Sequence, residues 1–285
     1  MAKKGAAPWV GAHVGGGIAN ALARAEAIGA TAIQLFGSSP RSWRATMPSV
    51  DAAKAFRAAR EKSAVRAVFL HAAYLVNLAS VSPDMYAFST QSLIDHLKIA
   101  EMIGAEGLIF HLGSGKGGDR EEAFAREIVA IKKILAAVPG KTKLIMENTA
   151  GGGGKIGASI EDVARIYHAV GAERLQVCYD TAHGFEAGLV EEYTPATVKK
   201  LFDAWESAVG MDALAAIHTN DSKTRSGSHH DQHENIGEGY IGLRGFVALA
   251  HEARLREKPW ILEVPGFDNE GPDKKNIDIL TNCFT

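Results

Sequence analysis

The chain has 285 residues, of which 46% are hydrophobic, so it can bury the core of one large α/β domain. Its net charge of −2 excludes a broadly basic nucleic-acid binder, and any affinity for DNA must come from local groups or bound metal ions. Two cysteines, Cys178 and Cys283, form no disulfide framework and fit a reducing cytoplasm. We find neither a signal peptide nor an apolar run of about 18 residues, and therefore expect a cytoplasmic protein that does not enter a membrane.

Short β-rich runs alternate eight times with longer runs of helical period, which is the pattern of an α/β protein of the (β/α)8 barrel type. The predicted strands cover residues 9–12, 32–36, 67–70, 107–110, 143–146, 175–179, 214–217 and 260–262. Helices are expected at residues 18–28, 50–61, 89–103, 120–137, 160–170, 197–209 and 243–256. No internal repeat or linker interrupts the pattern, so we predict a single domain over residues 1–285.

A doubly wound open sheet would give the same alternation of strands and helices. Such a sheet often carries a Gly-x-Gly-x-x-Gly turn after its first strand, whereas Gly15, Gly16 and Gly17 are contiguous in this chain. The glycine run at residues 151–154 is not followed by the Lys-Ser/Thr pair of a phosphate-binding P-loop. The closed barrel is therefore the favoured interpretation.

Possible metal ligands follow seven of the eight predicted strands. They are His13, His71, His111, Glu147, Asp180, His218 and Glu263. All strands of a barrel are parallel, so these residues share its C-terminal face, where barrel active sites lie. His183 joins them from the loop after the sixth strand, and Asp231 and His233 from the polar segment after the seventh, which has too little apolar content for a strand or helix.

Each of these residues has an ordinary structural explanation when it is considered alone. A histidine at a strand end is usually a hydrogen-bonded rim residue, and an acidic residue there is usually a helix N-cap. Their recurrence on one face favours a common site. We expect Cys178 to pack in the core, and His96, His168 and His251 to lie on helix surfaces.

The ligand types favour particular metals and a class of reaction. Imidazole mixed with carboxylate suits Zn²⁺ or Mn²⁺ better than Mg²⁺, which prefers oxygen ligands. Without His13 the candidates number nine, which is too many for one tetrahedral ion and fits two or three ions. Clustered divalent ions suit phosphoryl transfer, because one can activate water while others neutralise charge on the phosphate and the leaving oxygen.

Several motifs, taken in order, resemble those of the endonuclease IV family of apurinic/apyrimidinic endonucleases over roughly residues 9–268. They are GAHVGGG, LHAAYLVNL, HLGS, ENTAGGGGKIG, YDTAHGFEAG, HTNDSK, DQH and ILEVPGFD. The resemblance implies a xylose isomerase-like TIM barrel that holds three zinc ions, one of which could be replaced by manganese. It implies a first ion on His71, His111 and Glu147, a second on Glu147, Asp180, His218 and Glu263, and a third on His183, Asp231 and His233.

The resemblance further implies cleavage of double-stranded DNA 5′ to an abasic nucleotide, leaving a 3′-hydroxyl and a 5′-deoxyribose phosphate, in base excision repair. Glu147 and Glu263 are the expected catalytic residues. A monomer is expected, in the cytoplasm, and associated with the nucleoid if the source is bacterial. The candidates for DNA contact are Arg41, Tyr74, Leu75, Gln232 and His13, the first three at the family's inserting and wedge positions. Such wedges offset the cost of unstacking a flipped nucleotide.

One departure from the family pattern concerns the polar segment. Where the family commonly has Gly-Ser-Arg-x-Asp-Arg-His, this chain reads GSHHDQH, which places His229 and Gln232 at the two arginine positions. We expect metal binding to persist and DNA binding to be weaker or more sensitive to salt. Two alternatives stay open: a metal-dependent sugar isomerase or epimerase on the same barrel, and a lesion-binding protein that has lost catalysis.

Overall fold

A computed structural model describes residues 7–39 and 42–285. Eight parallel strands close into a barrel in the order β1-β10-β7-β6-β5-β4-β3-β2. The strands are β1 (Trp9–His13), β2 (Ala32–Phe36), β3 (Ala67–His71), β4 (Gly107–His111), β5 (Lys143–Glu147), β6 (Leu175–Asp180), β7 (Leu214–His218) and β10 (Pro259–Leu262). The prediction of a (β/α)8 barrel is therefore confirmed.

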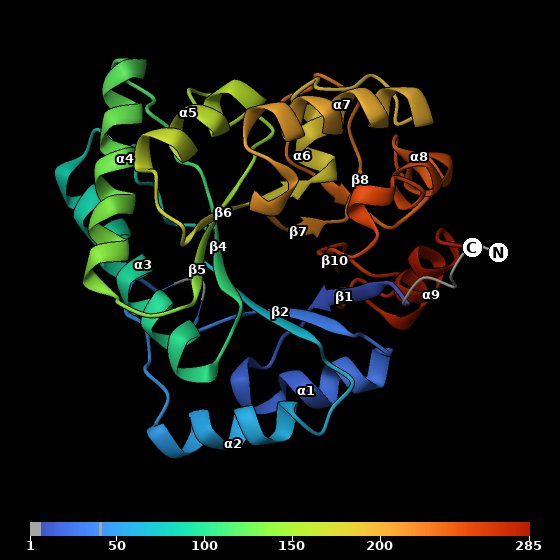
Figure 1. Ribbon diagram of the computed structural model, residues 1–285, viewed down its shortest axis with the longest axis horizontal. Coiled ribbons are helices and arrows are strands. Elements are labelled where there is room, and N and C mark those ends of the chain that lie inside the picture. Colours follow the sequence, from blue (N-terminus) through green and yellow to red (C-terminus); the bar gives the residue numbers. More distant parts are fainter. Residues whose placement is uncertain (1–6, 40–41) are drawn as a thin grey trace.

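Helices surround the barrel and connect its strands (Figure 1). They are α1 (Gly17–Ile28), α2 (Val50–Arg60), α3 (Pro83–Ile103), α4 (Arg120–Ala137), α5 (Ile160–Val170), α6 (Thr181–Glu186), α7 (Pro195–Ala208), α8 (Gly242–Ala250) and α9 (Lys274–Asn282), the last beside β1. Side-chain caps fix several starts: Ser159 accepts a hydrogen bond from the Asp162 backbone N–H, and Asp119 from that of Glu122. Within the described part of the chain, no helix combines the length and apolar content needed to span a bilayer.

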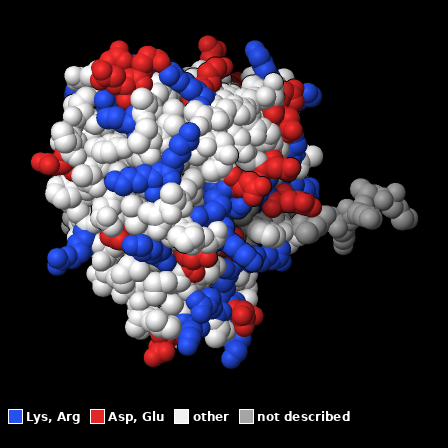
Figure 2. Space-filling view, turned by 60° about the vertical axis from the view of Figure 1, so that its left-hand side comes forward, with Lys and Arg blue, Asp and Glu red and all other residues white. Residues whose placement is uncertain are grey.

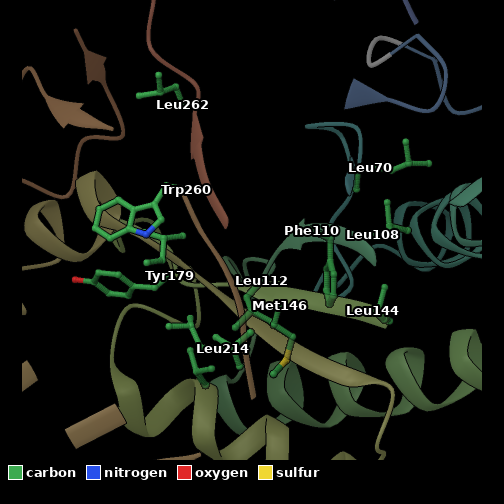
Figure 3. Close-up of a cluster of buried hydrophobic side chains, with 14 of the residues drawn as sticks. Leu70, Leu108, Phe110, Leu112, Leu144, Met146, Tyr179, Leu214, Trp260 and Leu262 are labelled. Atoms are coloured by element: carbon green, nitrogen blue, oxygen red, sulfur yellow. The ribbon is translucent and has the colours of Figure 1, made fainter. Parts of the chain in front are cut away.

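The core has two parts, because successive side chains of a strand point to opposite faces. The larger cluster lies between the strands and the helices, and Figure 3 shows Phe110, Met146 and Trp260 within it. The smaller cluster fills the barrel interior and includes Cys178, as predicted. Space in the interior is tight at Gly11, where an added Cβ would lie 1.6 Å from the carbonyl oxygen of Ala32.

The structure corrects several predicted boundaries. Six of the eight strands extend one residue further than predicted and thus include the polar residue at their end. Helix α3 starts at Pro83 rather than residue 89, because Ser82 caps it and proline is favoured in the first turn. The predicted helix at 243–256 ends at Ala250, and a 3-10 turn, Ala253–Leu255, follows it.

Four other features differ from the predictions. Helices α6 and α9 were not predicted. The polar segment after β7 forms a two-stranded antiparallel sheet, β8 (Asp221–Ser222) with β9 (His233–Glu234), contrary to the expectation of no strand. Low apolar content did not exclude strands here, because backbone pairing and the buried Asp221 carboxylate hold the segment in place. That carboxylate accepts hydrogen bonds from the backbone N–H groups of Gly237 and Ile241. His96 is buried rather than on the surface, and its Nδ1 lies 2.8 Å from the Ser92 carbonyl oxygen.

Candidate metal centre

The strand geometry explains why polar side chains gather at the C-terminal mouth of the barrel. The interior cluster contains Ala32, Phe69, Ile109, Ile145, Cys178, Ala216 and Ile261. The residue two positions after each of these points into the barrel as well. Those residues are Gln34, His71, His111, Glu147, Asp180, His218 and Glu263. One polar layer therefore lies directly above one apolar layer.

Glu147 is at the centre of the polar layer and is fully buried. One carboxylate oxygen, Oε2, lies 3.2 Å from His71 Nε2 and 3.1 Å from His111 Nε2. The other, Oε1, lies 2.8 Å from His218 Nδ1. Glu263 Oε2 approaches the same His218 nitrogen at 3.2 Å. The two oxygens of Glu147 thus face two different groups of ligands.

A third group lies beside these two. Helix α6 begins directly after Asp180, whose Oδ1 accepts a hydrogen bond from the His183 backbone N–H, so the helix brings His183 back over the barrel mouth. His183 Nε2 lies 3.2 Å from Asp231 Oδ2, and His233 Nε2 lies 3.5 Å from Asp231 Oδ1. The Asp-x-His pair therefore converges as its spacing predicts.

The donor set fits metal ions. The ligand atoms lie within 4.8 Å of one another in the group of His71, His111 and Glu147, and also in the group of Glu147, Asp180, His218 and Glu263. A further group joins Asp180 to His183 and His233. Imidazoles with carboxylates and no thiolate suit zinc or another transition metal.

The hydrogen bonds of the histidines support the same fit. Nδ1 of His183 lies 2.9 Å from the Asn148 carbonyl oxygen, and Nδ1 of His71 lies 2.8 Å from that of Ala72. A proton on Nδ1 leaves the lone pair on Nε2, which faces the cluster. Nε2 of His183 and of His233 is buried and makes no hydrogen bond among residues 7–39 and 42–285, although the Asp231 carboxylate lies 3.2 and 3.5 Å from them. Such buried nitrogens are suitable ligands.

The pKa values reflect the dense packing of opposite charges. Burial alone would raise the pKa of the Glu147 carboxyl, but His218 and His111 beside it hold that pKa well below its ordinary value. Burial would lower the pKa of His183, whereas Asp180 and Asp231 raise it well above its ordinary value. The carboxylate of Glu147 thus stays ionised and the imidazole of His183 holds its proton, and a divalent cation bound between such groups would displace that proton.

Three amides complete the site, and the search for residues after apolar runs missed them. Gln34 on β2 donates to Glu263 Oε1 at 2.6 Å, and its Oε1 lies 2.8 Å from His218 Nε2. Asn220 donates to Asp180 Oδ2 at 2.7 Å, and Asn148 Oδ1 accepts from the Asp180 backbone N–H at 2.7 Å. Asn148 and Asn220 lie one and two residues after a strand end, and the strand periodicity points to Gln34.

Glu186, at the end of α6, connects the third group to the polar segment. Its Oε1 accepts hydrogen bonds from Ser222 Oγ at 2.7 Å, the Gln232 backbone N–H at 3.2 Å and Thr224 Oγ1 at 3.4 Å. Its backbone carbonyl accepts from the His229 N–H at 3.0 Å. The buried carboxylate of Glu186 therefore joins the helix that carries His183 to the loop that carries Asp231 and His233.

Known proteins are similar to this chain in both sequence and fold. A family model described as a xylose isomerase-like TIM barrel matches residues 22–283. Endonuclease 4 of Thermus thermophilus is 38% identical over 265 residues, which cover 93% of this chain and 92% of the relative. Probable endonuclease 4 of Solibacter usitatus is 36% identical over 270 residues, covering 93% and 92%. The chain belongs to the endonuclease IV family. It is accordingly an endonuclease, an enzyme of the hydrolase class.

Solved structures agree with membership of the endonuclease IV family. The crystal structure of an endonuclease IV from Thermus thermophilus matches with a TM-score of 0.83 at 36% identity, covering 97% of this chain and 98% of that one. A D-tagatose 3-epimerase-like protein also matches, with a TM-score of 0.72 at 17% identity, covering 96% of each chain. Likeness at that identity shows a shared fold alone. Proteins of both kinds thus share the barrel fold, and the assignment of this chain to the endonuclease IV family rests on sequence identity.

Four of the five residues expected to contact DNA in this endonuclease IV family member lie in or near a cavity at the barrel mouth. A cavity of about 770 Å³ opens over the candidate metal centre, and Tyr74 and Leu75 line it with 69% and 41% of their surfaces exposed. Gln232 is exposed on the loop between the small strands. His13 lies inside the site, 3.0 Å from Gln34 Nε2, and burial lowers its pKa to about 4. Arg41 lies outside the described residues.

Proposed function

We propose that the protein is a zinc-dependent endonuclease that cleaves double-stranded DNA 5′ to abasic sites, leaving a 3′-hydroxyl and a 5′-deoxyribose phosphate. In this proposal it acts as a monomer in base excision repair, in the cytoplasm and, if the source is bacterial, at the nucleoid. One observation carries the proposal. Nine His, Asp and Glu residues converge at the barrel mouth of a chain that is 38% identical to an endonuclease 4.

The proposed ligand sets follow the three groups of the site. His71, His111 and Glu147 would hold one ion, Glu147 with Asp180, His218 and Glu263 a second, and His183, Asp231 and His233 a third. When bound, such ions supply water activation and neutralise charge that develops on the phosphate and the leaving oxygen. Six positive charges against four carboxylates would leave the site positive, which suits an anionic phosphodiester.

Other groups of the chain orient these ligands. Gln34 holds Glu263 from one side, and the backbone N–H of Glu263 donates to Asn220 Oδ1 at 2.7 Å. Glu263 is therefore fixed at two points, with its second carboxylate oxygen near His218. A carboxylate held in this way can accept a proton from the attacking water or keep the water oriented, as general base catalysis requires.

Tyr74 and Leu75 would act on the DNA rather than on the reacting phosphate. Both are exposed at the edge of the groove, and the Tyr74 ring packs edge-to-face on Phe36, with ring centroids 5.5 Å apart and an angle of 75° between the ring planes. This contact supports the ring from below and leaves its outer face free. A rigid aromatic group in this position can fill the space of a flipped abasic nucleotide and replace part of the lost stacking.

The decisive experiment uses one end-labelled duplex with a single abasic site, with and without a chelator. We expect a cut at the 5′ side of the lesion whose upstream product a polymerase extends, because extension requires a 3′-hydroxyl. The matched intact duplex should stay uncut, and chelation should abolish cleavage. Specific binding without cleavage by the metal-loaded protein would favour the lesion-binding alternative. Absence of both binding and cleavage would refute the proposal.

A further inference from the structure

Two loops at the rim of the groove are joined into one platform. The loop after β4, residues 112–116, lies against the glycine-rich loop after β5, residues 150–157. Ser114 and Lys155 form an antiparallel bridge. The Gly115 backbone N–H donates to the Gly154 carbonyl and the Ile156 N–H to the Gly113 carbonyl, each at 3.0 Å. These bonds cross the two loops and fix their relative position.

The glycines allow this close approach. A Cβ added at Gly154 would lie 3.1 Å from both the backbone N and the Cα of Lys116, and the φ of Gly154 is +80°. Asn77 anchors the platform from a third loop, since its Oδ1 accepts from the Ser114 N–H at 2.9 Å and its Nδ2 donates to the Ser114 carbonyl at 3.0 Å. These hydrogen bonds fix the conformation of the platform and hold the backbones of Lys116 and Lys155 close together.

Both lysines of this platform are available to an anion. Lys155 lines the cavity over the metal centre together with His111 and His183, and Lys116 is exposed next to it. Neither ammonium group forms an ion pair or hydrogen bond with a carboxylate of the described residues. A partially buried cation that has no protein partner and lies beside a catalytic groove is suited to a phosphate.

The charge of the chain and the neighbouring loop indicate why such cations matter. The net charge of the chain is −2, and on the side of the molecule drawn in Figure 2 acidic and basic side chains are interspersed. The loop with His229 and Gln232 packs on the same platform: His229 Nδ1 lies 2.9 Å from the Ala150 carbonyl oxygen. Two lysines of the platform therefore lie beside a loop that has no lysine or arginine at positions 229 and 232.

We propose that Lys155, assisted by Lys116, binds backbone phosphates of the DNA strand that lies in the groove. This inference rests on the proposed function, because it assumes a DNA substrate. It assigns to the platform a role in substrate binding and none in hydroxide activation or proton transfer. We therefore expect the two lysines to affect the salt dependence of DNA binding but not the turnover rate.

The test measures kcat and kcat/KM on the abasic duplex at several salt concentrations for the zinc-loaded enzyme. Each lost phosphate contact should make the slope of log kcat/KM against log salt shallower by about 0.9. We expect this change for Lys155→Gln, a larger change for the double variant with Lys116→Gln, and a slope near that of the wild type for Lys155→Arg. The kcat at saturating DNA should stay within about twofold of the wild type, because the metal ligands are untouched.

Lys141→Gln is the matched control. Lys141 is exposed and precedes β5, at the opposite end of the barrel, so its removal should leave the slope unchanged. An unchanged slope in Lys155→Gln, with a wild-type enzyme that cleaves the duplex, would overturn this inference and leave the proposed function intact. A fall in kcat at saturating DNA with an unchanged slope would overturn it too. Failure of the wild-type enzyme to cut the duplex would instead refute the proposed function.

Discussion

Replacing Glu186 by alanine tests whether its carboxylate holds the third group of ligands in place. Three donors converge on Glu186 Oε1, from Ser222, Thr224 and the Gln232 backbone. Ser222 Oγ and Thr224 Oγ1 have other acceptors, the carbonyls of Thr224 and His230. The Gln232 N–H would lose its acceptor, which costs about 1–3 kcal/mol when the group is buried. Because Gln232 is exposed, water can reach the loop and the lower end of that range applies.

A second effect of the alanine substitution works in the opposite direction. Burial raises the pKa of Glu186 to about 7, and its Oε2 is buried without a hydrogen-bond partner among the described residues. Removing this carboxylate relieves a desolvation cost, so the free energy of unfolding of the whole protein should change little. The substitution should instead make the loop that carries Asp231 and His233 less ordered. About 1.4 kcal/mol of added ordering cost lowers the affinity for the zinc ion expected there by about tenfold.

Competition with a chromophoric chelator measures this effect by counting the tightly held zinc ions of each variant. We expect Glu186→Ala to release one ion at about tenfold lower chelator concentration than the wild type. Glu186→Gln keeps an acceptor oxygen at the same place and should behave like the wild type. Glu252→Ala, which removes a carboxylate bound to Arg254 outside the site, is the control. An alanine variant with wild-type zinc affinity, or a glutamine variant as weak as alanine, would refute this account of Glu186.

Four further outcomes are expected. The purified protein should hold about three divalent ions, mainly zinc, and elemental analysis showing one ion or fewer in an active preparation would contradict the ligand assignment. Glu263→Gln should keep the fold but lose most cleavage, since an amide neither supplies charge to a metal nor accepts a proton, whereas near wild-type cleavage would mean that Glu263 is misassigned. Gln232→Arg should tighten binding of abasic duplex and steepen the salt slope by about 0.9, with little change in turnover at saturating DNA. An unchanged slope with a raised turnover rate would mean that residue 232 acts on the transition state rather than on binding. Burial raises the pKa of Glu127 from 4.5 to about 8, so its contribution to stability is fully present below about pH 4.5 and lost as the pH rises through about 8. Urea unfolding should therefore find Glu127→Gln more stable than the wild type by roughly 3–5 kcal/mol at pH 9 and nearly equal at pH 4.5, and equal stability at both pH values would show that Glu127 is not buried as a charge.

Much of the fold could be predicted because the strands are apolar and regularly spaced. Six of the eight strand ends were placed one residue early, since a histidine or carboxylate is typical of the start of a loop although here it is still part of the strand. Helix α6 could not be predicted from periodicity. It has six residues, and its start depends on the Asp180 carboxylate that caps the His183 N–H, a contact that also serves the site. Short elements of this kind are set by tertiary contacts rather than by intrinsic propensity.

The ligand candidates could be predicted because one rule, a polar residue after an apolar run, applies to parallel strands that share a face. The rule fails on β2, where Phe36 ends the strand and the inward polar residue is Gln34. It also cannot find Glu186, whose role depends on a loop that is distant in sequence. Arrangements that depend on side chains meeting across loops follow from packing, and a single sequence carries no direct signal for them.

The amide of Gln34 has a physical reason to be neutral. Its neighbours in the polar layer are His13, His218 and Glu263, and it must donate to the carboxylate while accepting from the imidazole. A carboxylate at this position would repel Glu263 and compete with it for any cation, whereas a lysine could not accept from His218. An amide satisfies both partners and fixes the His218 ring so that Nδ1 faces Glu147. Strand β2 thus contributes no ligand to the proposed sets but contributes the group that orients two of them, His218 and Glu263.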